Sequence, residues 1–580
     1  MDPTAGPGWL KHFPLLADLH RSSGRALAQD GIAGTITAIL LIPQALAYAL
    51  LAGLPPEIGL YASVLPVIVY ALLGSSRVLA VGPVAVAAVM VSAALVPYAG
   101  DDPARYLSGA LILSGLSGAI LLAMAALKLG WLTHFISHPV LSGFTTGAAL
   151  YIVGTQLSGL TGIPVPREAG AAGIVAALFA GRGRLDPETL AFGLGAMLLL
   201  FAARTPLVAL LMRLGLKRET AGSLGRTAPL LLVIVATVLS ASLDAQARWG
   251  VAVVGAIPQG LPRLSLRFLA EDGWLQLLAP AAMIAIIGYV ESISVAKALA
   301  FRRQERIDPD RELLALGCTN VIAAVAGAMP VAGGFARSMV NYEAGARSQL
   351  AAVITALWVA LAALLFTGLL APLPKAVLAA IIVVAVWQLV DFASLRHSWR
   401  YDRGDGAAQA ATIAGVLAQG VEAGLMIGAG LSLLLFLYRT SRPHIAVVGQ
   451  VGDSEHFRNV LRHEVRTWPD LLLLRIDETL YFANAPRVES ELQAYIVEAK
   501  QPKDVVLVMS GVAYIDTSGL DVLEALATAL AGNGSRLHLA EVKGPVMDRL
   551  AGTDLLAALG ASRVHLSAHG AISAIQSLTR

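Results

Sequence analysis

The residues best suited to chemistry are a few charged side chains inside long apolar runs. The segment PVAGGFARSMV, residues 330–340, holds Arg337 and two glycines between the apolar runs 311–328 and 350–369. A charge at the centre of a membrane costs about 2.5–3.5 kcal/mol on insertion scales, so it normally faces a cavity or a partner. A bound anion would be such a partner. A salt bridge to Glu291 is the structural alternative.

Glu291 is the only acidic residue in the apolar run IIGYVESISVAKAL. Proton-driven transporters use intramembrane carboxylates as titrating groups. Glu291 is therefore a candidate for coupling transport to protons. The alternative is an ion pair with Lys297 or Arg337 that only stabilises helix packing.

The composition indicates a polytopic membrane protein. Hydrophobic residues make up 56% of the 580 positions and charged residues only 14%, whereas soluble domains average about 25% charged residues. The net charge of +3 is too small to indicate nucleic-acid binding. The single cysteine, Cys318, excludes an intrachain disulfide framework and a cysteine metal cluster. We expect no cofactor, no metal site and no enzymatic activity.

Fourteen apolar runs are predicted to cross the membrane between residues 31 and 440, although several are shorter than the roughly 20 residues that a spanning helix needs. Residues 1–30 are polar and mixed in charge, so we expect a cytoplasmic N-terminal segment without a cleavable signal peptide. The predicted spans are 31–52, 60–74, 82–98, 107–127, 132–154, 187–203, 227–243, 277–299, 311–328, 336–347, 350–370, 373–390, 407–420 and 421–438.

Basic loop residues gather on one side of this arrangement. Four clusters of them follow the even-numbered spans six, eight, twelve and fourteen, and cytoplasmic loops carry an excess of Lys and Arg. We therefore expect both termini in the cytoplasm of a bacterium and the spans in its inner membrane. The residues are Arg213, Lys217, Arg218, Arg226, Arg302, Arg303, Arg306, Arg311, Arg396, Arg400, Arg403, Arg439 and Arg442.

Two short segments resemble each other and predict an inverted repeat. VGPVAVAAVM (81–90) and AMPVAGGFARSMV (328–340) each carry a Pro-Val-Ala core with a glycine nearby. They belong to the third and tenth spans, seven apart, so the two copies run in opposite directions. Paired Gly/Pro-interrupted segments are typical of transporters that bind substrate between half-helix N-termini. Those ends attract anions. Simple helix packing is the alternative reading.

After Arg442 the composition becomes that of a soluble domain. Short apolar runs rich in β-branched residues alternate with helical patterns, as in DVVLVMSGVAYIDTSGLDVLEALATAL. Such alternation indicates an α/β domain, which we place at residues 443–580.

Long motifs resemble the sulfate permease (SulP) family, which includes prestin and pendrin. The resemblance rests on IPQALAYALLAGLPPEIGLYASVLPVIVYALLGSSRVLAVGPVAV (42–86), on GYVESISVAKALA, on GGFARSMVNYEAGARSQLA and on the STAS-domain segment YIDTSGLDVLEAL. It implies seven plus seven inverted spans divided into core and gate subdomains. It also implies a C-terminal cytoplasmic STAS domain and homodimers. The substrates would be small anions such as sulfate, bicarbonate, chloride or dicarboxylates.

The resemblance also implies site residues. Gln44 and Tyr48 match residues of span one that line the anion site in the family, and Glu291 matches an acidic position. The starts of spans three and ten match at Pro83, Val84, Ala336, Arg337 and Ser338.

This chain departs from some relatives at two positions. Ala336 replaces a hydroxyl side chain, and Val295 replaces a hydroxyl one turn after the acidic residue. Because a hard cation binds oxygen ligands, Val295 makes sodium coupling less favoured than proton coupling.

Ser518 in the STAS segment DTSG matches the serine that is phosphorylated in bacterial anti-sigma antagonists. It is a candidate regulatory phosphosite, and a cytoplasmic regulatory protein is an expected partner there. Helix capping by Asp516, Thr517 or Ser518 is the alternative.

These features predict a secondary transporter of a small anion, with sulfate and proton symport as the first choice and an elevator-type movement of the core. Bicarbonate or a dicarboxylate such as fumarate is the alternative substrate. An uncoupled anion channel or exchanger, and a signalling platform that acts through the STAS domain, are alternative functions.

Overall fold

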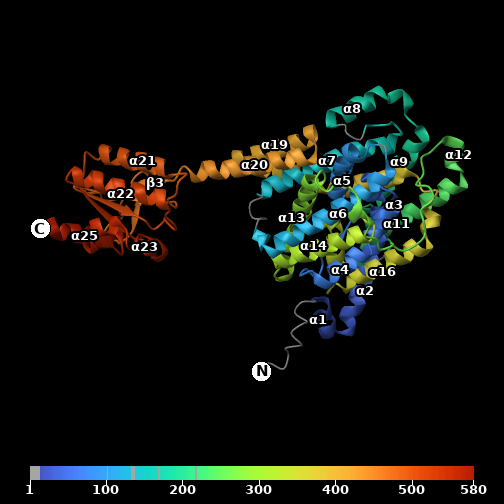
Figure 1. Cartoon of the computed structure of the whole chain (residues 1–580), viewed down its shortest axis with the longest axis horizontal. Coiled ribbons are helices and arrows are strands. Elements are labelled where there is room, and N and C mark those ends of the chain that lie inside the picture. Colours follow the sequence, from blue (N-terminus) through green and yellow to red (C-terminus); the bar gives the residue numbers. More distant parts are fainter. Residues whose placement is uncertain are drawn as a thin grey trace. The chain divides into compact units, whose positions relative to one another are not determined.

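The computed structural model describes residues 14–100, 102–131, 137–166, 170–204, 206–215 and 218–579. Residues 1–13 of the predicted N-terminal segment, residues 132–136 of one predicted span and Lys217 lie outside the described residues. The chain divides into two compact units, Met1–Gly430 and Leu431–Arg580, each of which is considered by itself (Figure 1).

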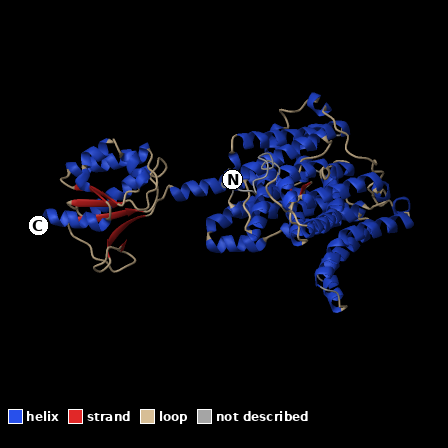
Figure 2. Ribbon diagram, turned by 90° about the horizontal axis from the view of Figure 1, so that it is seen from below, coloured by secondary structure: helices blue, strands red, loops and turns tan. Residues whose placement is uncertain are grey.

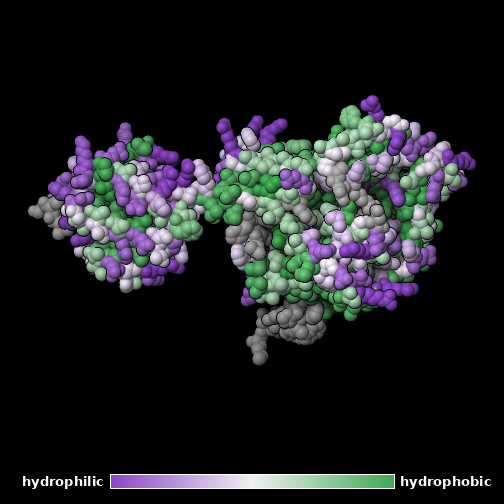
Figure 3. All heavy atoms as spheres, turned by 45° about the horizontal axis from the view of Figure 1, so that its top comes forward, coloured by the Kyte–Doolittle hydropathy of each residue, from purple (hydrophilic) through white to green (hydrophobic). Residues whose placement is uncertain are grey.

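The first unit is helical and crosses the membrane many times. Each of the fourteen predicted spans contains a helix. Among the described residues, seven helical segments are by themselves long and apolar enough to span a bilayer. Hydrophobic side chains cover much of the face of this unit that Figure 3 shows. The prediction of a polytopic helical membrane protein is confirmed.

The helices of this unit pack in two groups, the predicted core and gate. The core contains α2 (Gly24–Leu51), α3 (Pro56–Tyr61), α4 (Leu65–Leu73), α5 (Ala85–Ala99), α6 (Pro103–Ala126), α13 (Leu278–Arg303), α14 (Pro309–Val325), α15 (Phe335–Glu343) and α16 (Leu350–Leu365). The gate contains α7 (His138–Thr161), α9 (Pro187–Arg204), α11 (Arg218–Ser242), α17 (Lys375–Val386) and α19 (Arg403–Gln419), with α20 (Val421–Thr440) next in the chain.

The contacts between helices reveal the inverted repeat. In the first half, α6 packs against α13 and α14 of the second half. In the second half, α16 packs against α2 and α4 of the first half in the same way. Each half of the chain therefore supplies the helices that complete the other half of the core.

Shorter helices connect the spans. They are α1 (Pro14–Arg21), α8 (Ala171–Ala180), α10 (Pro206–Arg213), α12 (Ala245–Trp249) and α18 (Phe392–Tyr401), with the 3-10 turns η3 (Arg182–Arg184), η4 (Arg267–Ala270), η5 (Thr367–Leu370) and η6 (Trp387–Leu389).

Two long core helices begin at the same local signal. Asp102 precedes Pro103 at the start of α6, and Asp308 precedes Pro309 at the start of α14. Each aspartate accepts hydrogen bonds from two backbone N–H groups of the first turn. Proline fits the first helical position because its missing N–H would have no partner there. These caps fix where both helices start.

The two repeat segments meet in a short antiparallel pair. β1 (Val81–Gly82) pairs with β2 (Ala332–Gly333), with Val81 opposite Gly333 and Gly82 opposite Ala332. The two Pro-Val-Ala triplets are not equivalent in space. The first begins after β1 and enters α5, whereas the second precedes β2 and enters it. The sequence located the repeat, but the similarity of the triplets gives the wrong register.

The second unit has a six-stranded sheet in the order β4-β3-β5-β6-β7-β8 (Figure 2). β5 to β8 are parallel, and β3 and β4 are antiparallel. The elements are β3 (Ile445–Gln450), β4 (Phe457–Asn459), β5 (Leu471–Ile476), α21 (Ala485–Glu498), β6 (Asp504–Val508), α22 (Thr517–Gly532), β7 (Arg536–Ala540), α23 (Gly544–Leu550), α24 (Asp554–Leu559), η7 (Ala561–Arg563), β8 (Val564–His565) and α25 (Ala568–Thr579).

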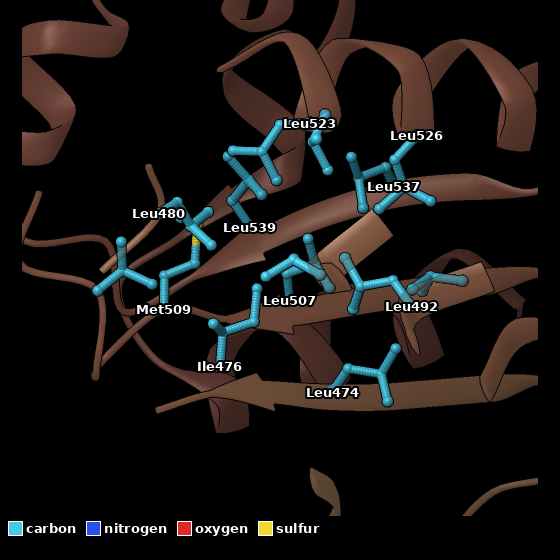
Figure 4. Packing of buried hydrophobic residues seen from close by; sticks show 14 of the residues in the cluster. Leu474, Ile476, Leu480, Leu492, Leu507, Met509, Leu523, Leu526, Leu537 and Leu539 are labelled. Carbon is cyan, nitrogen blue, oxygen red and sulfur yellow. The ribbon is translucent and has the colours of Figure 1, made fainter. Parts of the chain in front are cut away.

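Helices cover both faces of this sheet. One core contains Leu474, Leu507 and Leu539 beneath α21 and α22 (Figure 4), and the other lies beneath α25. Because both faces are covered, all five residues of β6 are buried, as expected for a central parallel strand. The predicted α/β domain is confirmed.

Candidate functional site

Two helix N-termini meet near the middle of the first unit. α5 begins after Val84 and α15 begins after Gly334, and neither has a side-chain cap. The first-turn N–H groups of a helix have no intrahelical partner and form the positive end of its dipole. With nine residues, about 14 Å, α15 is too short to cross a bilayer core of about 30 Å. The β1–β2 pair just before these helices brings both starts to one place.

A small cavity with a volume of about 40 Å³ lies at these two helix starts. Its walls come from α2, α5, α13 and α15 of the core, and from α17 and η6 of the gate. Six of the eight residues predicted for the membrane site line it: Gln44, Tyr48, Val84, Glu291, Ala336 and Arg337.

Arg337 is almost fully buried in the wall of this cavity, with 2% of its surface exposed. Its Nη1 donates to the carbonyl of Pro83 at 2.5 Å. Its Nε and Nη2 have no hydrogen-bond partner among the described residues. A buried donor without a partner costs about 1–3 kcal/mol, and more when it is charged. A ligand with acceptor oxygens would remove this cost.

Glycines let the guanidinium approach the backbone closely. A Cβ at Gly334 would lie 3.0 Å from Nη2 of Arg337, and one at Gly82 would lie 3.3 Å from it. Gly82 also has a φ of +156°, a backbone conformation that residues other than glycine rarely adopt. Because neither glycine has a Cβ, the backbone leaves room for the Arg337 guanidinium.

Glu291 faces the same cavity from α13. Within the described chain, its carboxylate forms no hydrogen bond or ion pair, and neither Arg337 nor Lys297 pairs with it. The salt bridge that was the alternative to a functional site is therefore not formed in the part of the chain that the structure describes. The carboxylate and the guanidinium instead share one small space.

Gln44 and Tyr48 enter the cavity from α2, one turn apart. Their exposed fractions are 3% and 7%. Neither the amide nor the hydroxyl bonds to any described residue. Both groups therefore remain available to a ligand.

Pro83 and Ser338 do not line the cavity. Pro83 supplies the carbonyl that holds Arg337. The Ser338 hydroxyl is buried, accepts from the N–H of Ala80 at 2.8 Å and donates to the carbonyl of Gly334 at 2.7 Å. In this arrangement Ser338 ties α15 to the segment before β1.

Polar residues that sequence reasoning missed hold β2 in place. The amide of Asn320 accepts from the N–H of Val331 at 2.9 Å and donates to its carbonyl at 3.0 Å. The hydroxyl of Ser292, next to Glu291, accepts from the N–H of Gly333 at 2.7 Å. The sequence contained a signal for Asn320, which is a lone amide in an apolar span. A polar side chain within a membrane usually forms hydrogen bonds to neighbouring helices.

Two more amides hold the segment before β1. Gln349 donates to the carbonyls of Ser76 and Leu79, at 2.5 and 3.1 Å, and Asn341 donates to the carbonyl of Val78 at 3.1 Å. Both half-helix starts are therefore braced by side chains from other core helices.

The gate contributes only apolar groups to the cavity. Ala385, Val386 and Leu389 face the helix starts, and none of them was predicted. A second cavity of about 430 Å³ shares Gln44 and Ala336 with the first and extends to Glu343 at the end of α15. It lies between core and gate helices.

Ser518 lies in the first turn of α22 in the second unit. The N-cap of this helix is Asp516, which accepts from the N–H groups of Gly519 and Phe482 at 2.9 and 2.8 Å. The Ser518 hydroxyl bonds to no described residue. Capping is therefore the role of Asp516, and phosphorylation of Ser518 stays a prediction.

Residues 27–412 match the family model described as the Sulfate permease family, and residues 462–571 match the STAS domain. The chain is 34% identical to the chloroplastic sulfate transporter 4.1 of Arabidopsis thaliana, over 86% of this chain and 72% of that protein. It is 32% identical to a probable sulfate transporter of Mycobacterium tuberculosis, over 99% of this chain and all of that protein.

Solved structures share the fold. The murine Slc26a9 anion transporter in its inward-facing state matches with a TM-score of 0.88 at 23% identity, covering 98% of this chain and 94% of that one. The transmembrane domain of the cyanobacterial bicarbonate transporter BicA matches with a TM-score of 0.60 at 21% identity, covering 71% of this chain and 98% of that one.

Proposed function

Because this chain belongs to the sulfate permease family, we propose that it is a secondary active transporter that moves sulfate across the bacterial inner membrane together with protons. That the chain is a multi-pass membrane protein that transports an anion is supported by the family and by relatives named as sulfate transporters. The substrate, the coupling ion and the mechanism are our proposals.

One observation carries the proposal. Two helix N-termini and a buried guanidinium face one cavity, and among the described residues the helices have no side-chain cap and Nε and Nη2 of the guanidinium have no partner. All three features favour negative charge. Gln44 and Tyr48 add neutral polar groups that suit oxyanion atoms. Residues that occupy or brace this anion site are Gln44, Tyr48, Pro83, Val84, Ala336, Arg337 and Ser338.

Glu291 supports proton coupling. An anion in the cavity repels the ionised carboxylate and therefore favours its protonated form. By linkage, a protonated Glu291 favours anion binding to the same extent. The loaded carrier then crosses with both, and the empty carrier returns with neither. A passive channel for anions gives no reason for an acid in this position.

We propose an elevator-type movement of the core against the gate. Every polar group of the site belongs to the core, whereas the facing gate residues are apolar. The site can therefore travel with the core without breaking polar contacts to the gate. The second cavity beside α15 would be the route to one side of the membrane.

The assembly and topology are proposals as well. The basic residues after even-numbered spans support cytoplasmic termini, and the family resemblance supports a homodimer. The STAS domain would bind a cytoplasmic regulatory protein, with Ser518 as the modified residue.

Uptake into proteoliposomes tests the proposal. Labelled sulfate, bicarbonate and fumarate are offered to the purified full chain, with and without an inward proton gradient, and protein-free liposomes are the control. We expect saturable sulfate uptake that the gradient accelerates. Faster uptake of bicarbonate or fumarate than of sulfate would identify that anion as the substrate instead of sulfate. Uptake without gradient dependence would favour a channel or exchanger, and no uptake of any of the three anions would overturn the proposal.

A further inference from the structure

A large groove on the first unit lies on another face of α2 than the candidate anion site. It has a volume of about 850 Å³ and is lined by α2, α11 and α16, together with η5 and Pro372 just after it. α2 and α16 belong to the core and α11 to the gate, so the groove runs along the boundary between the two groups.

Matching apolar stripes form two of its walls. On α2 the lining residues recur at intervals of three and four from Thr35 to Leu46, and on α11 they recur with the same spacing from Leu230 to Ala241. Each stripe covers twelve positions, so it is about 16 Å long. That length is close to half of the roughly 30 Å hydrocarbon core of a bilayer. These positions lie at the middle of the predicted spans 31–52 and 227–243, so the groove lies around the centre of the bilayer.

The walls offer no polar recognition. No charged residue of the described chain lines the groove. The Thr35 hydroxyl donates to the carbonyl of Gly31 and accepts from the indole N–H of Trp358, at 2.8 and 3.0 Å. The Thr237 hydroxyl donates to the carbonyl of Val233 at 2.6 Å. With these donors satisfied internally, the side chains present only hydrocarbon to an occupant.

We propose that this groove is a binding site for the acyl chain of a membrane lipid. Ile234, Val238 and Leu369 in its lining are 50–66% exposed, and at this depth the surrounding medium is lipid. Acyl chains end at the centre of the bilayer and consist of hydrocarbon, as the lining of the groove requires. The bound chain lies in the groove beside the contact of α11 with α2, and it must rearrange when core and gate move, a consequence that rests on the proposed function.

Filling the groove tests the site. Ala241→Phe on α11 and Ala362→Phe on α16 each add a ring to its lining, singly and together. Ala360→Phe is the matched control, because Ala360 is on α16 but outside the lining. Each full-length variant is reconstituted in phosphatidylcholine nanodiscs and released for native mass spectrometry.

The wild type and Ala360→Phe should retain bound phosphatidylcholine, and the double variant should lose it several-fold. Each single variant should lose less phosphatidylcholine than the double variant. The single variants still test the site if the double variant does not fold. Equal retention in all variants would overturn the proposal, as would loss of a second copy of the chain instead of lipid.

Sulfate uptake by the same variants separates this inference from the proposed function. We expect the maximal rate to change in the filled variants while the half-saturating sulfate concentration stays the same. Absence of uptake in every variant, with lipid lost only from the filled ones, would count against the transport proposal and leave the lipid site standing.

Discussion

Arg337 combines a permanent charge with two buried donors that lack partners in the described chain. We predict that Arg337→Gln weakens the binding of a divalent anion more than the binding of a monovalent one, because the Coulomb energy scales with ligand charge. Hydrogen bonds to charged groups contribute about 1.5–3 kcal/mol, which corresponds to a roughly ten- to hundredfold rise in the half-saturating sulfate concentration. Competition between sulfate and a monovalent anion measures the effect. Equal weakening of both anions would make Arg337 a structural residue.

Glu291 differs from Arg337 because it shares the cavity without a partner of its own among the described residues. Glu291→Gln imitates the protonated acid permanently. We predict that it keeps or improves anion binding and abolishes the acceleration of uptake by an inward proton gradient, while anion exchange continues. Uptake and exchange assays in proteoliposomes separate the two activities. A variant that responds to the gradient like the wild type would exclude Glu291 as the coupling group.

At the scale of elements, the start of α15 depends on glycine for its geometry. Gly334 has a φ of −92° that alanine can adopt, so Gly334→Ala should leave the fold intact. Its Cβ would lie 3.0 Å from Nη2 of Arg337 and force the guanidinium aside. Off-rotamer side chains cost about 0.5–1.5 kcal/mol, so we predict a roughly two- to tenfold loss of sulfate affinity.

Thermal denaturation and uptake kinetics check this prediction together. Gly195→Ala in α9 is the matched control, because a Cβ there meets no atom within 4 Å. Unchanged affinity in Gly334→Ala would show that the position of the guanidinium does not matter.

At the scale of the whole molecule, the second unit carries its own hydrophobic cores. We predict that truncation before residue 443 leaves membrane insertion intact and lowers transport or dimer stability. Membrane-fraction yield, uptake and size-exclusion mass measure the three properties. A truncated chain that is fully active and still dimeric would contradict a regulatory role for the STAS domain.

The stability of the second unit should depend on pH. Burial lowers the pKa of His538 below 6.5, although the hydrogen-bonded carboxylate of Asp504 opposes this, and burial also lowers the pKa of His565. The unfolded chain therefore binds protons at a higher pH than the folded chain does. The free energy of unfolding should fall as the pH drops below about 6.5.

His538→Gln tests the origin of this slope, because it keeps an N–H group for Asp504 but cannot take up a proton. We expect a flatter dependence between pH 7.5 and 5.5, measured on the full chain by hydrogen exchange in β6 and β7. If the variant's stability depends on pH as steeply as that of the wild type, groups other than His538 cause the dependence.

The sequence by itself determined the membrane architecture and the α/β domain, and it named six residues that line one cavity. Apolar runs and strand-helix alternation are local signals, because the hydrophobic pattern within a short stretch of sequence indicates the secondary structure of that stretch. The charges of Arg337 and Glu291 were informative because an apolar span makes them costly. The bounds 31–440 and 443–580 for the two domains stay predictions.

Only the tertiary structure decided which groups meet. The register of β1 on β2, the bracing of Val331 by Asn320 and the engaged hydroxyl of Ser338 depend on segments far apart in the chain. So do the absence of a Glu291–Arg337 pair in the described chain and the gate wall at Leu389. The physical reason is that hydrogen bonds and packing act over a few ångströms in space, and local sequence patterns do not encode which distant segments come that close.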